Sequence, residues 1–218
     1  MTALVRYLCT TLLLSQRYLA PLLLFTGLVA VLTSSDTGPL TAAYGAAAGA
    51  MLLCSTWLTI ALVGLEDQAH RAVVVVNAGG SRRVLVGTVC AAVLCCLVLT
   101  GLGLGIPFLV GTHRLTVAAL LVGVEAQLTC ALTGIAVGLL CSRLVFRRQG
   151  YALLLALVLL SVLMVAKGLP PVNPLLSRLA TTSRAADLLT PAGGLLVVAA
   201  GVLAAGAALT RAIADRRS

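Results

Sequence analysis

Uncharged apolar stretches occupy most of this chain, and six of them are long enough to cross a lipid bilayer. An α-helix rises about 1.5 Å per residue, so roughly 20 apolar residues cover the ~30 Å hydrocarbon core. The six stretches are residues 18–33, 40–64, 84–110, 115–142, 149–166 and 188–210. Little is left for a soluble domain, so we expect the protein to act inside a membrane.

The composition agrees with a membrane protein. Of the 218 residues, 61% are hydrophobic and 10% are charged, and the mean hydropathy is +1.13. A soluble domain normally carries about a quarter charged residues. The net charge of +9 does not indicate a nucleic-acid partner, because Lys and Arg are spread between the apolar stretches instead of forming one basic patch.

The distribution of basic residues predicts the topology. With both termini assigned to the cytoplasm, eleven of the fifteen Lys and Arg residues fall on the cytoplasmic side. These eleven are Arg6, Arg17, Arg71, Arg82, Arg83, Arg143, Arg147, Arg148, Arg211, Arg216 and Arg217. The outer four are Arg114, Lys167, Arg178 and Arg184. This bias follows the positive-inside rule, so we predict six spans in the cell membrane with both termini inside.

Residues 1–17, which precede the first span, are a separate element. At helical spacing Arg6 and Thr10 fall near one face, while Leu8 and Leu12 fall near another. This pattern favours a short helix lying in the cytoplasmic interface. The alternative is a frayed N-terminal tail.

Motifs of common catalytic and metal sites are missing from the sequence. It has no G-x-x-x-x-G-K-[ST] phosphate loop, G-x-S-x-G elbow or H-E-x-x-H pair. The seven cysteines include no C-x-x-C pair, and His70 and His113 are far apart. We therefore expect neither an enzyme nor a metal or cofactor site, and we interpret the cysteines as small apolar residues in helix contacts.

The segment between the second and third stretches, residues 65–83, has the most informative pattern. Glu66 and Asp67 stand where a helix N-terminus favours negative charge. Asp67 and Arg71 are four residues apart and can pair on one helical face. Valines fill residues 73–76. The pattern predicts a short amphipathic helix that docks on a soluble partner.

Small and basic residues end this segment. Gly79 and Gly80 provide a helix end, and Ser81 can cap the third span. Arg82 and Arg83 follow at the predicted cytoplasmic surface. The alternative to a docking helix is an ordinary cytoplasmic loop that lies along the membrane.

This order of acidic pair, short helix, small residues, basic pair and next span resembles ABC-2 type permeases, the membrane subunits of ABC exporters. In that family the loop is the coupling helix, which fits a cleft on a separate ATPase subunit. The resemblance implies that the coupling residues of this chain are Glu66, Asp67, Arg71, Val74, Arg82 and Arg83.

Two further segments are similar to the same family. In the fourth stretch, Gly134 and Gly138 form a G-x-x-x-G motif, which allows helices to approach closely. The outer segment 167–191 is long for a simple turn, and Asn173 and Pro174 are typical of a helix cap and first helical position. The family has short re-entrant helices near the exit of its pathway at this place.

The fourth stretch also contains an acidic residue near mid-membrane. Glu125, Thr129 and Thr133 follow at four-residue intervals and make a narrow polar stripe. An ionised carboxylate at this depth is costly. The stripe either lines a pathway or subunit interface, or it holds a hydrogen-bonded carboxyl that fixes the helix register.

Together these features predict an all-α polytopic membrane protein with a single transmembrane domain over residues 1–218. Its parts are an interfacial helix (1–17), spans one and two (18–64), the cytoplasmic coupling loop (65–83), spans three to five (84–166), an outer re-entrant segment (167–191), and span six with a cytoplasmic tail (192–218).

The resemblance implies the permease subunit of an ABC-2 type exporter. Two such permeases, identical or homologous, would pair and sit on two ATPase subunits, which bind ATP and Mg²⁺; this chain would hold no cofactor. Small drugs, lipids, peptides and cell-envelope glycans are all compatible substrates. The alternatives are a membrane subunit of a haem-export or cytochrome-maturation complex, and a non-transporting membrane scaffold or immunity protein.

Overall fold

Nearly every residue that the structure describes lies in a helix. The computed structural model describes residues 2–34, 40–65, 74–77, 79–110, 116–142, 149–166, 171–181 and 185–215. The helices are α1 (Thr2–Ser15), α2 (Leu19–Ser34), α3 (Leu40–Val63), α5 (Ser81–Val110), α6 (Val117–Leu140), α7 (Gln149–Val165), α8 (Val172–Thr181), the 3-10 turn η1 (Ala185–Leu188) and α9 (Leu189–Asp215). No strand occurs within these ranges, which confirms the predicted all-α class.

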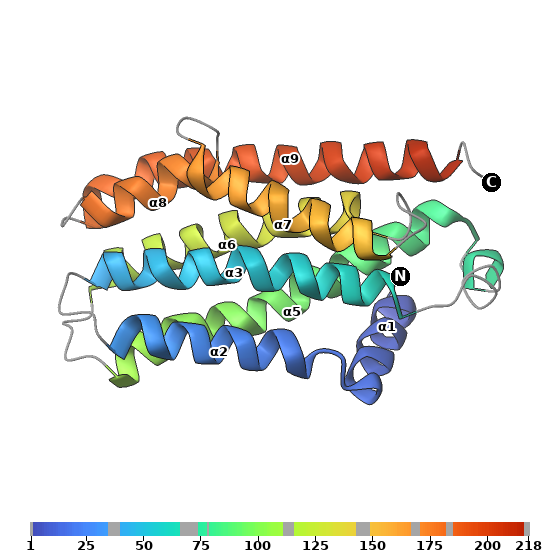
Figure 1. Cartoon of the computed structure of the whole chain (residues 1–218), viewed down its shortest axis with the longest axis horizontal. Helices are drawn as coiled ribbons and strands as arrows, with labels where there is room; N and C mark the ends of the chain where they lie inside the picture. The colour runs from blue at the N-terminus through green and yellow to red at the C-terminus, as the bar shows by residue number, and fades with distance from the viewer. Residues whose placement is uncertain are drawn as a thin grey trace.

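The long helices run back and forth along one axis, and α1 crosses them at one end (Figure 1). α1 and α2 meet at an angle of 78°. Both termini and the short turn 74–77 lie at this same end of the bundle, which we call the termini end (Figure 1). α8 and the first turns of α3 and α6 lie at the opposite end (Figure 1).

Four helical segments of the described chain are long and apolar enough to cross a membrane: Leu40–Val63, Ser81–Pro107, Val117–Leu140 and Ala185–Ile213. The bent pair of α1 and α2 adds a fifth if it is counted as one broken span. α2 and α7 have 16 and 17 residues, fewer than the roughly 20 that a crossing needs. The structure therefore gives four to five candidates for the six predicted crossings.

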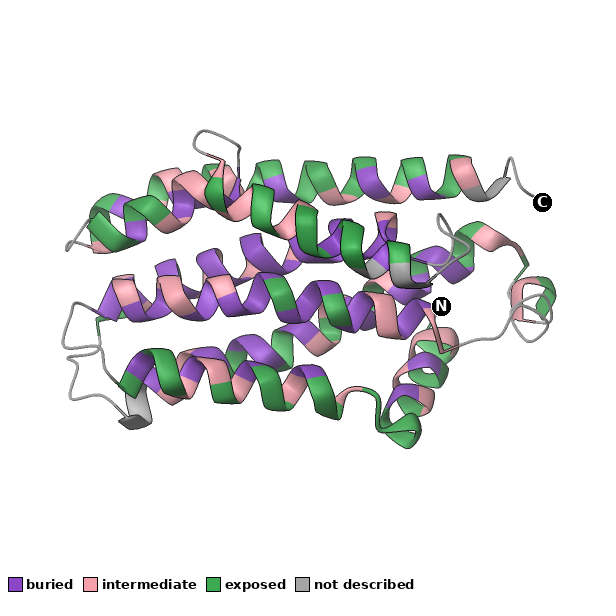
Figure 2. Ribbon diagram, in the orientation of Figure 1, coloured by how far each residue is buried: buried purple, intermediate pink, exposed green. Residues whose placement is uncertain are grey.

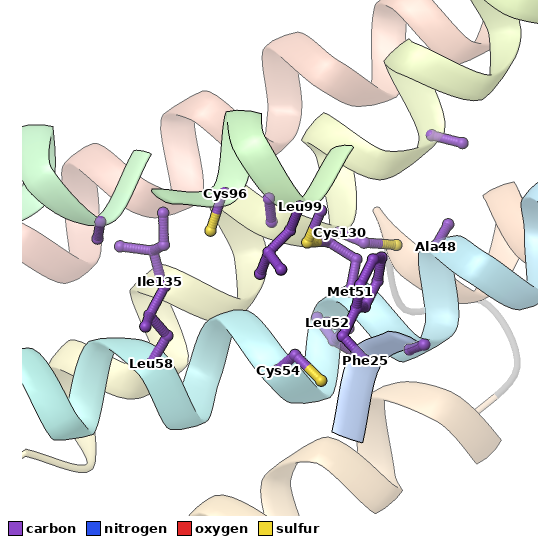
Figure 3. Close-up of a cluster of buried hydrophobic side chains, with 14 of the residues drawn as sticks. Phe25, Ala48, Met51, Leu52, Cys54, Leu58, Cys96, Leu99, Cys130 and Ile135 are labelled. Carbon is purple, nitrogen blue, oxygen red and sulfur yellow. The ribbon is translucent and has the colours of Figure 1, made fainter. Parts of the chain in front are cut away.

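Apolar side chains from four helices meet in the interior. Phe25 of α2, Met51 of α3, Leu99 of α5 and Cys130 of α6 belong to one buried cluster (Figure 3). Cys54 and Cys130 are fully buried there among apolar neighbours, which agrees with the packing role predicted for the cysteines. Cys90, in contrast, is exposed.

The outer faces of the bundle are also apolar. α9 and α7 carry large exposed side chains such as Val197, Val202 and Leu154 (Figure 2). Within the apolar stretch of the span Ala185–Ile213, which includes most of α9, only 17% of the residues are buried, compared with 67% in the corresponding stretches of α3 and α6. Extended apolar surface of this kind is typical of contact with lipid, so α3 and α6 form the centre and α9 the periphery.

α3 and α6 pack through small residues. A Cβ atom on Gly134 would lie 2.6 Å from the carbonyl oxygen of Leu52, and one on Gly138 would lie 2.8 Å from the carbonyl oxygen of Thr56. The Thr56 hydroxyl donates a hydrogen bond to the Gly134 carbonyl oxygen at 3.0 Å. The close approach predicted from the G-x-x-x-G motif is confirmed.

The predicted outer segment contains α8, which packs on the bundle. Leu175 and Leu179 are buried, and a Cβ atom on Gly45 would lie 3.3 Å from the Leu179 Cβ. α8 begins at Val172, so the prediction that Asn173 caps it is wrong. The Asn173 amide instead donates to the Met164 carbonyl oxygen at 2.8 Å, because the preceding helix α7 ends close by with unpaired carbonyl groups.

Candidate functional site

A helical turn stands between α3 and α5 at the termini end. Residues 74–77 are helical, and the N–H groups of Gly79 and Gly80 donate to the carbonyl oxygens of Val76 (3.2 Å) and Val75 (2.9 Å). Gly79 has a φ of 74°, a left-handed conformation that glycine adopts without steric cost. The predicted glycine helix end is therefore present, and α5 begins directly afterwards at Ser81.

This turn presents an apolar side chain outward. Val76 is 80% exposed, whereas Val74 is half-buried. Arg82 and Arg83, in the first turn of α5, are exposed. The structure thus places three of the predicted coupling residues, Val74, Arg82 and Arg83, at the termini end. Glu66, Asp67 and Arg71 lie outside the described residues.

The same end of the bundle is joined to the elbow between α1 and α2. Gln16, at this elbow, has a φ of 54°, and the chain bends there between the two helices. Arg17 donates from Nη1 to the Gly64 carbonyl oxygen at 3.0 Å. A Cβ atom on Gly87 of α5 would lie 2.7 Å from Leu4 Cδ2. α1 therefore packs against the start of α5, and the elbow that follows α1 is bonded to the chain just after α3.

The face pattern predicted for the N-terminal helix is present. Leu8 and Leu12 are each 2% exposed, whereas Arg6 and Thr10 are exposed. This arrangement suits a helix with one side on the bundle and one side at a polar interface.

The predicted polar stripe of α6 lies in a contact with α9. The side chains of Thr129 and Thr133 are buried, and each donates to the carbonyl oxygen four residues earlier, at 2.7 and 2.8 Å. A Cβ atom on Gly193 of α9 would lie 3.7 Å from Glu125 Oε1. Glu125 Oε2 is buried with no hydrogen-bond partner among the described residues. The two threonine hydroxyls thus have hydrogen-bond acceptors within their own helix, whereas Glu125 Oε2 has no partner among the described residues.

Two further polar side chains, outside the predicted stripe, are buried in the bundle. Tyr44 and Gln127 are fully buried, and neither the Tyr44 hydroxyl nor the Gln127 amide has a partner in the described part of the chain. A Cβ atom on Gly103 would lie 2.5 Å from Gln127 Nε2, and one on Gly123 would lie 2.8 Å from the Tyr44 ring. The two glycines make room for these side chains. The sequence signals are one tyrosine among the Ala and Gly residues of 42–50, and an amide, Gln127, on another face of the stretch that contains Glu125.

The described residues contain no group of three or more His, Cys, Asp or Glu side chains that could hold a metal ion. All seven cysteines are free thiols. Comparisons with models of known families, with curated proteins and with solved structures found no match to this chain.

Proposed function

We propose that this chain is the membrane permease subunit of an ABC-2 type exporter, driven by separate ATPase subunits. The observation that carries the proposal is the turn 74–77, whose Val76 side chain is 80% exposed at the termini end. An apolar side chain beyond the ends of the long helices is well placed to enter a cleft of a soluble partner. Glu66, Asp67 and Arg71 complete the proposed coupling surface.

The proposal includes six crossings with both termini in the cytoplasm. α2 and α7 run along the same axis as the longer helices, although α7 stops short of the end where α8 lies (Figure 1), and by helical rise the two cover about 24–26 Å. A bilayer adapts to short spans by local thinning. Arg6, Arg82 and Arg83 lie at the termini end, which supports a cytoplasmic position for that end.

The contacts at the termini end suggest how ATPase closure would move the spans. A push on the segment between α3 and α5 acts directly on the start of α5 and the end of α3. The bond from Arg17 to the Gly64 carbonyl extends this motion to the elbow of α1 and α2. Because Gly134 of α6 packs directly on the α3 backbone, α3 and α6 should move as one body.

In this proposal two permeases, identical or homologous, form the pathway, and ATP and Mg²⁺ bind only to the ATPase subunits. Glu125, with its unpartnered carboxylate oxygen, is the residue of the polar stripe that we assign to the pathway or the permease interface. Thr129 and Thr133 support the register of α6 on α9.

The test replaces the exposed valine with a charge. The protein is purified from its native membrane with its associated ATPase, and ATP hydrolysis is measured in nanodiscs. Val76→Asp should reduce the hydrolysis that the permease stimulates by about tenfold to a hundredfold, because an apolar side chain buried in an interface contributes roughly 1.5–3 kcal/mol. Its fold should be unaffected, since Val76 is exposed in this chain.

A matched control is Val117→Asp at the opposite end. Val117 is 75% exposed and is the first residue of α6, where a carboxylate is tolerated. This variant should retain full hydrolysis. Normal association and hydrolysis in Val76→Asp would exclude the coupling role. Isolation of the chain with a haem-handling partner would favour a haem-export subunit, and isolation with partners that hydrolyse no nucleotide would favour a scaffold or immunity protein.

A further inference from the structure

An apolar cavity of about 290 Å³ lies in the elbow between α1 and α2. Its walls come from four helices and the intervening turn, and they include Cys9, Tyr18, Leu22, Leu58, Leu94 and Val98. The volume is near the lower limit of ligand pockets, roughly 300–1,000 Å³. It is large enough for part of one hydrocarbon chain, and the walls offer almost no polar atoms.

The cavity opens toward the lipid-facing side of the bundle. Leu13, Leu94 and Val98 form part of its wall and are 58%, 48% and 66% exposed. A peptide segment would bring N–H and C=O groups into this wall, where they would find few partners at a cost of several kcal/mol each. The occupant that fits the wall is a hydrocarbon chain.

Two arginines flank wall residues of the cavity along the chain. Arg6 is three residues before Cys9 and seven before Leu13, so all three share one face of α1. Arg17 directly precedes Tyr18, and only its Nη1 is used in the bond to Gly64. A guanidinium carries five N–H donors, so Arg17 keeps donors for a second acceptor.

We infer that this elbow binds a phospholipid with an anionic headgroup. One acyl chain occupies the cavity, and the headgroup phosphate contacts Arg6 and Arg17 at the termini end. The bound chain fills the angle between α1 and α2 and so stabilises the elbow. The inference rests on the cavity and its flanking charges, and it holds whether or not the chain couples to an ATPase.

The test uses photoreactive lipids in nanodiscs. Phosphatidylglycerol and phosphatidylcholine, each with a diazirine on one acyl chain, are photolysed with the full-length protein, and labelled residues are mapped by mass spectrometry. Phosphatidylglycerol should label residues 9–22 and 94–99 several-fold more than phosphatidylcholine does. Labelling of the exposed α9 surface around Val197 reports non-specific lipid contact, and it should be equal for the two lipids.

Three variants and one control separate the contribution of the headgroup from that of the acyl chain. Arg6→Gln and Arg17→Gln should each reduce elbow labelling by phosphatidylglycerol roughly fivefold, as expected for one basic side chain near an anionic lipid. Arg178→Gln, an exposed arginine of α8 at the opposite end, should have no effect. Val98→Phe should reduce elbow labelling by phosphatidylglycerol, because the larger side chain occupies part of the cavity. The fold should tolerate this substitution, since Val98 is exposed.

Equal elbow labelling by the two phospholipids would overturn the headgroup assignment. A third probe, diazirine palmitate, tests the source of the chain, and elbow labelling by this fatty acid without labelling by phosphatidylglycerol would overturn the phospholipid assignment. If none of the three probes labels residues 9–22 or 94–99 more than the α9 surface around Val197, the cavity holds no lipid and the inference is wrong.

Discussion

Gln127 is fully buried, and both polar atoms of its amide lack a partner in the described part of the chain. A buried group in this state costs about 1–3 kcal/mol. Gly103 accommodates the side chain, so the position is compatible with an apolar side chain of the same length. The amide is therefore a candidate for a role other than stability.

Gln127→Met should raise the free energy of unfolding by about 1–3 kcal/mol, because methionine has a similar unbranched shape and removes the unpaired amide. Equilibrium unfolding in bicelles measures the change. Thr129→Val is the control, since the Thr129 hydroxyl already donates to the Glu125 carbonyl and its loss should not stabilise the protein. A lower stability of Gln127→Met would show that the amide has a partner in the membrane, such as a buried water.

At the scale of elements, the contact of α3 with α6 is organised by glycine. Gly134 lies against the carbonyl oxygen of Leu52 and the hydroxyls of Ser55 and Thr56. Gly101 of α5, in contrast, has no heavy atom within 4 Å of its Cβ position. The same substitution should therefore have opposite effects at these two positions.

Gly134→Ala should lower the free energy of unfolding by about 1–3 kcal/mol, because the added methyl group meets backbone that cannot move without separating the helices. Gly101→Ala should be neutral or stabilising by up to about 1 kcal/mol through helix propensity. Both are measured by the same unfolding assay. Equal effects would mean that α3 and α6 do not pack closely in the bilayer.

The sequence predicted the helices well because hydropathy is a local signal. α3, for instance, runs over Leu40–Val63, against a predicted stretch of 40–64. Features that depend on tertiary contacts were not predictable from this signal. They include the 78° angle at the elbow, the cavity beside it, and the start of α8, whose Asn173 pairs with the end of α7. The burial of Tyr44 and Gln127 was not predictable either, because the glycines that accommodate these side chains lie on other parts of the chain.

At the scale of the whole molecule, the helices alternate in direction so that both termini and the turn 74–77 lie at one end, and α8 lies at the other (Figure 1). The proposed function requires the termini end to face the cytoplasm, where ATP is. Arg82 and Ser177 are exposed side chains at the two ends. A cysteine at each position therefore reports which side of the membrane that end faces.

Ser177→Cys should react with a membrane-impermeant maleimide in intact cells, whereas Arg82→Cys should react only after the membrane is permeabilised. The unsubstituted protein gives the background from its native thiols, of which Cys90 is exposed on the lipid-facing surface and should be inaccessible to the polar reagent. The physical basis is that the reagent cannot cross the hydrocarbon core. Labelling of Arg82→Cys in intact cells would place the turn 74–77 outside, where no cytoplasmic ATPase can bind it.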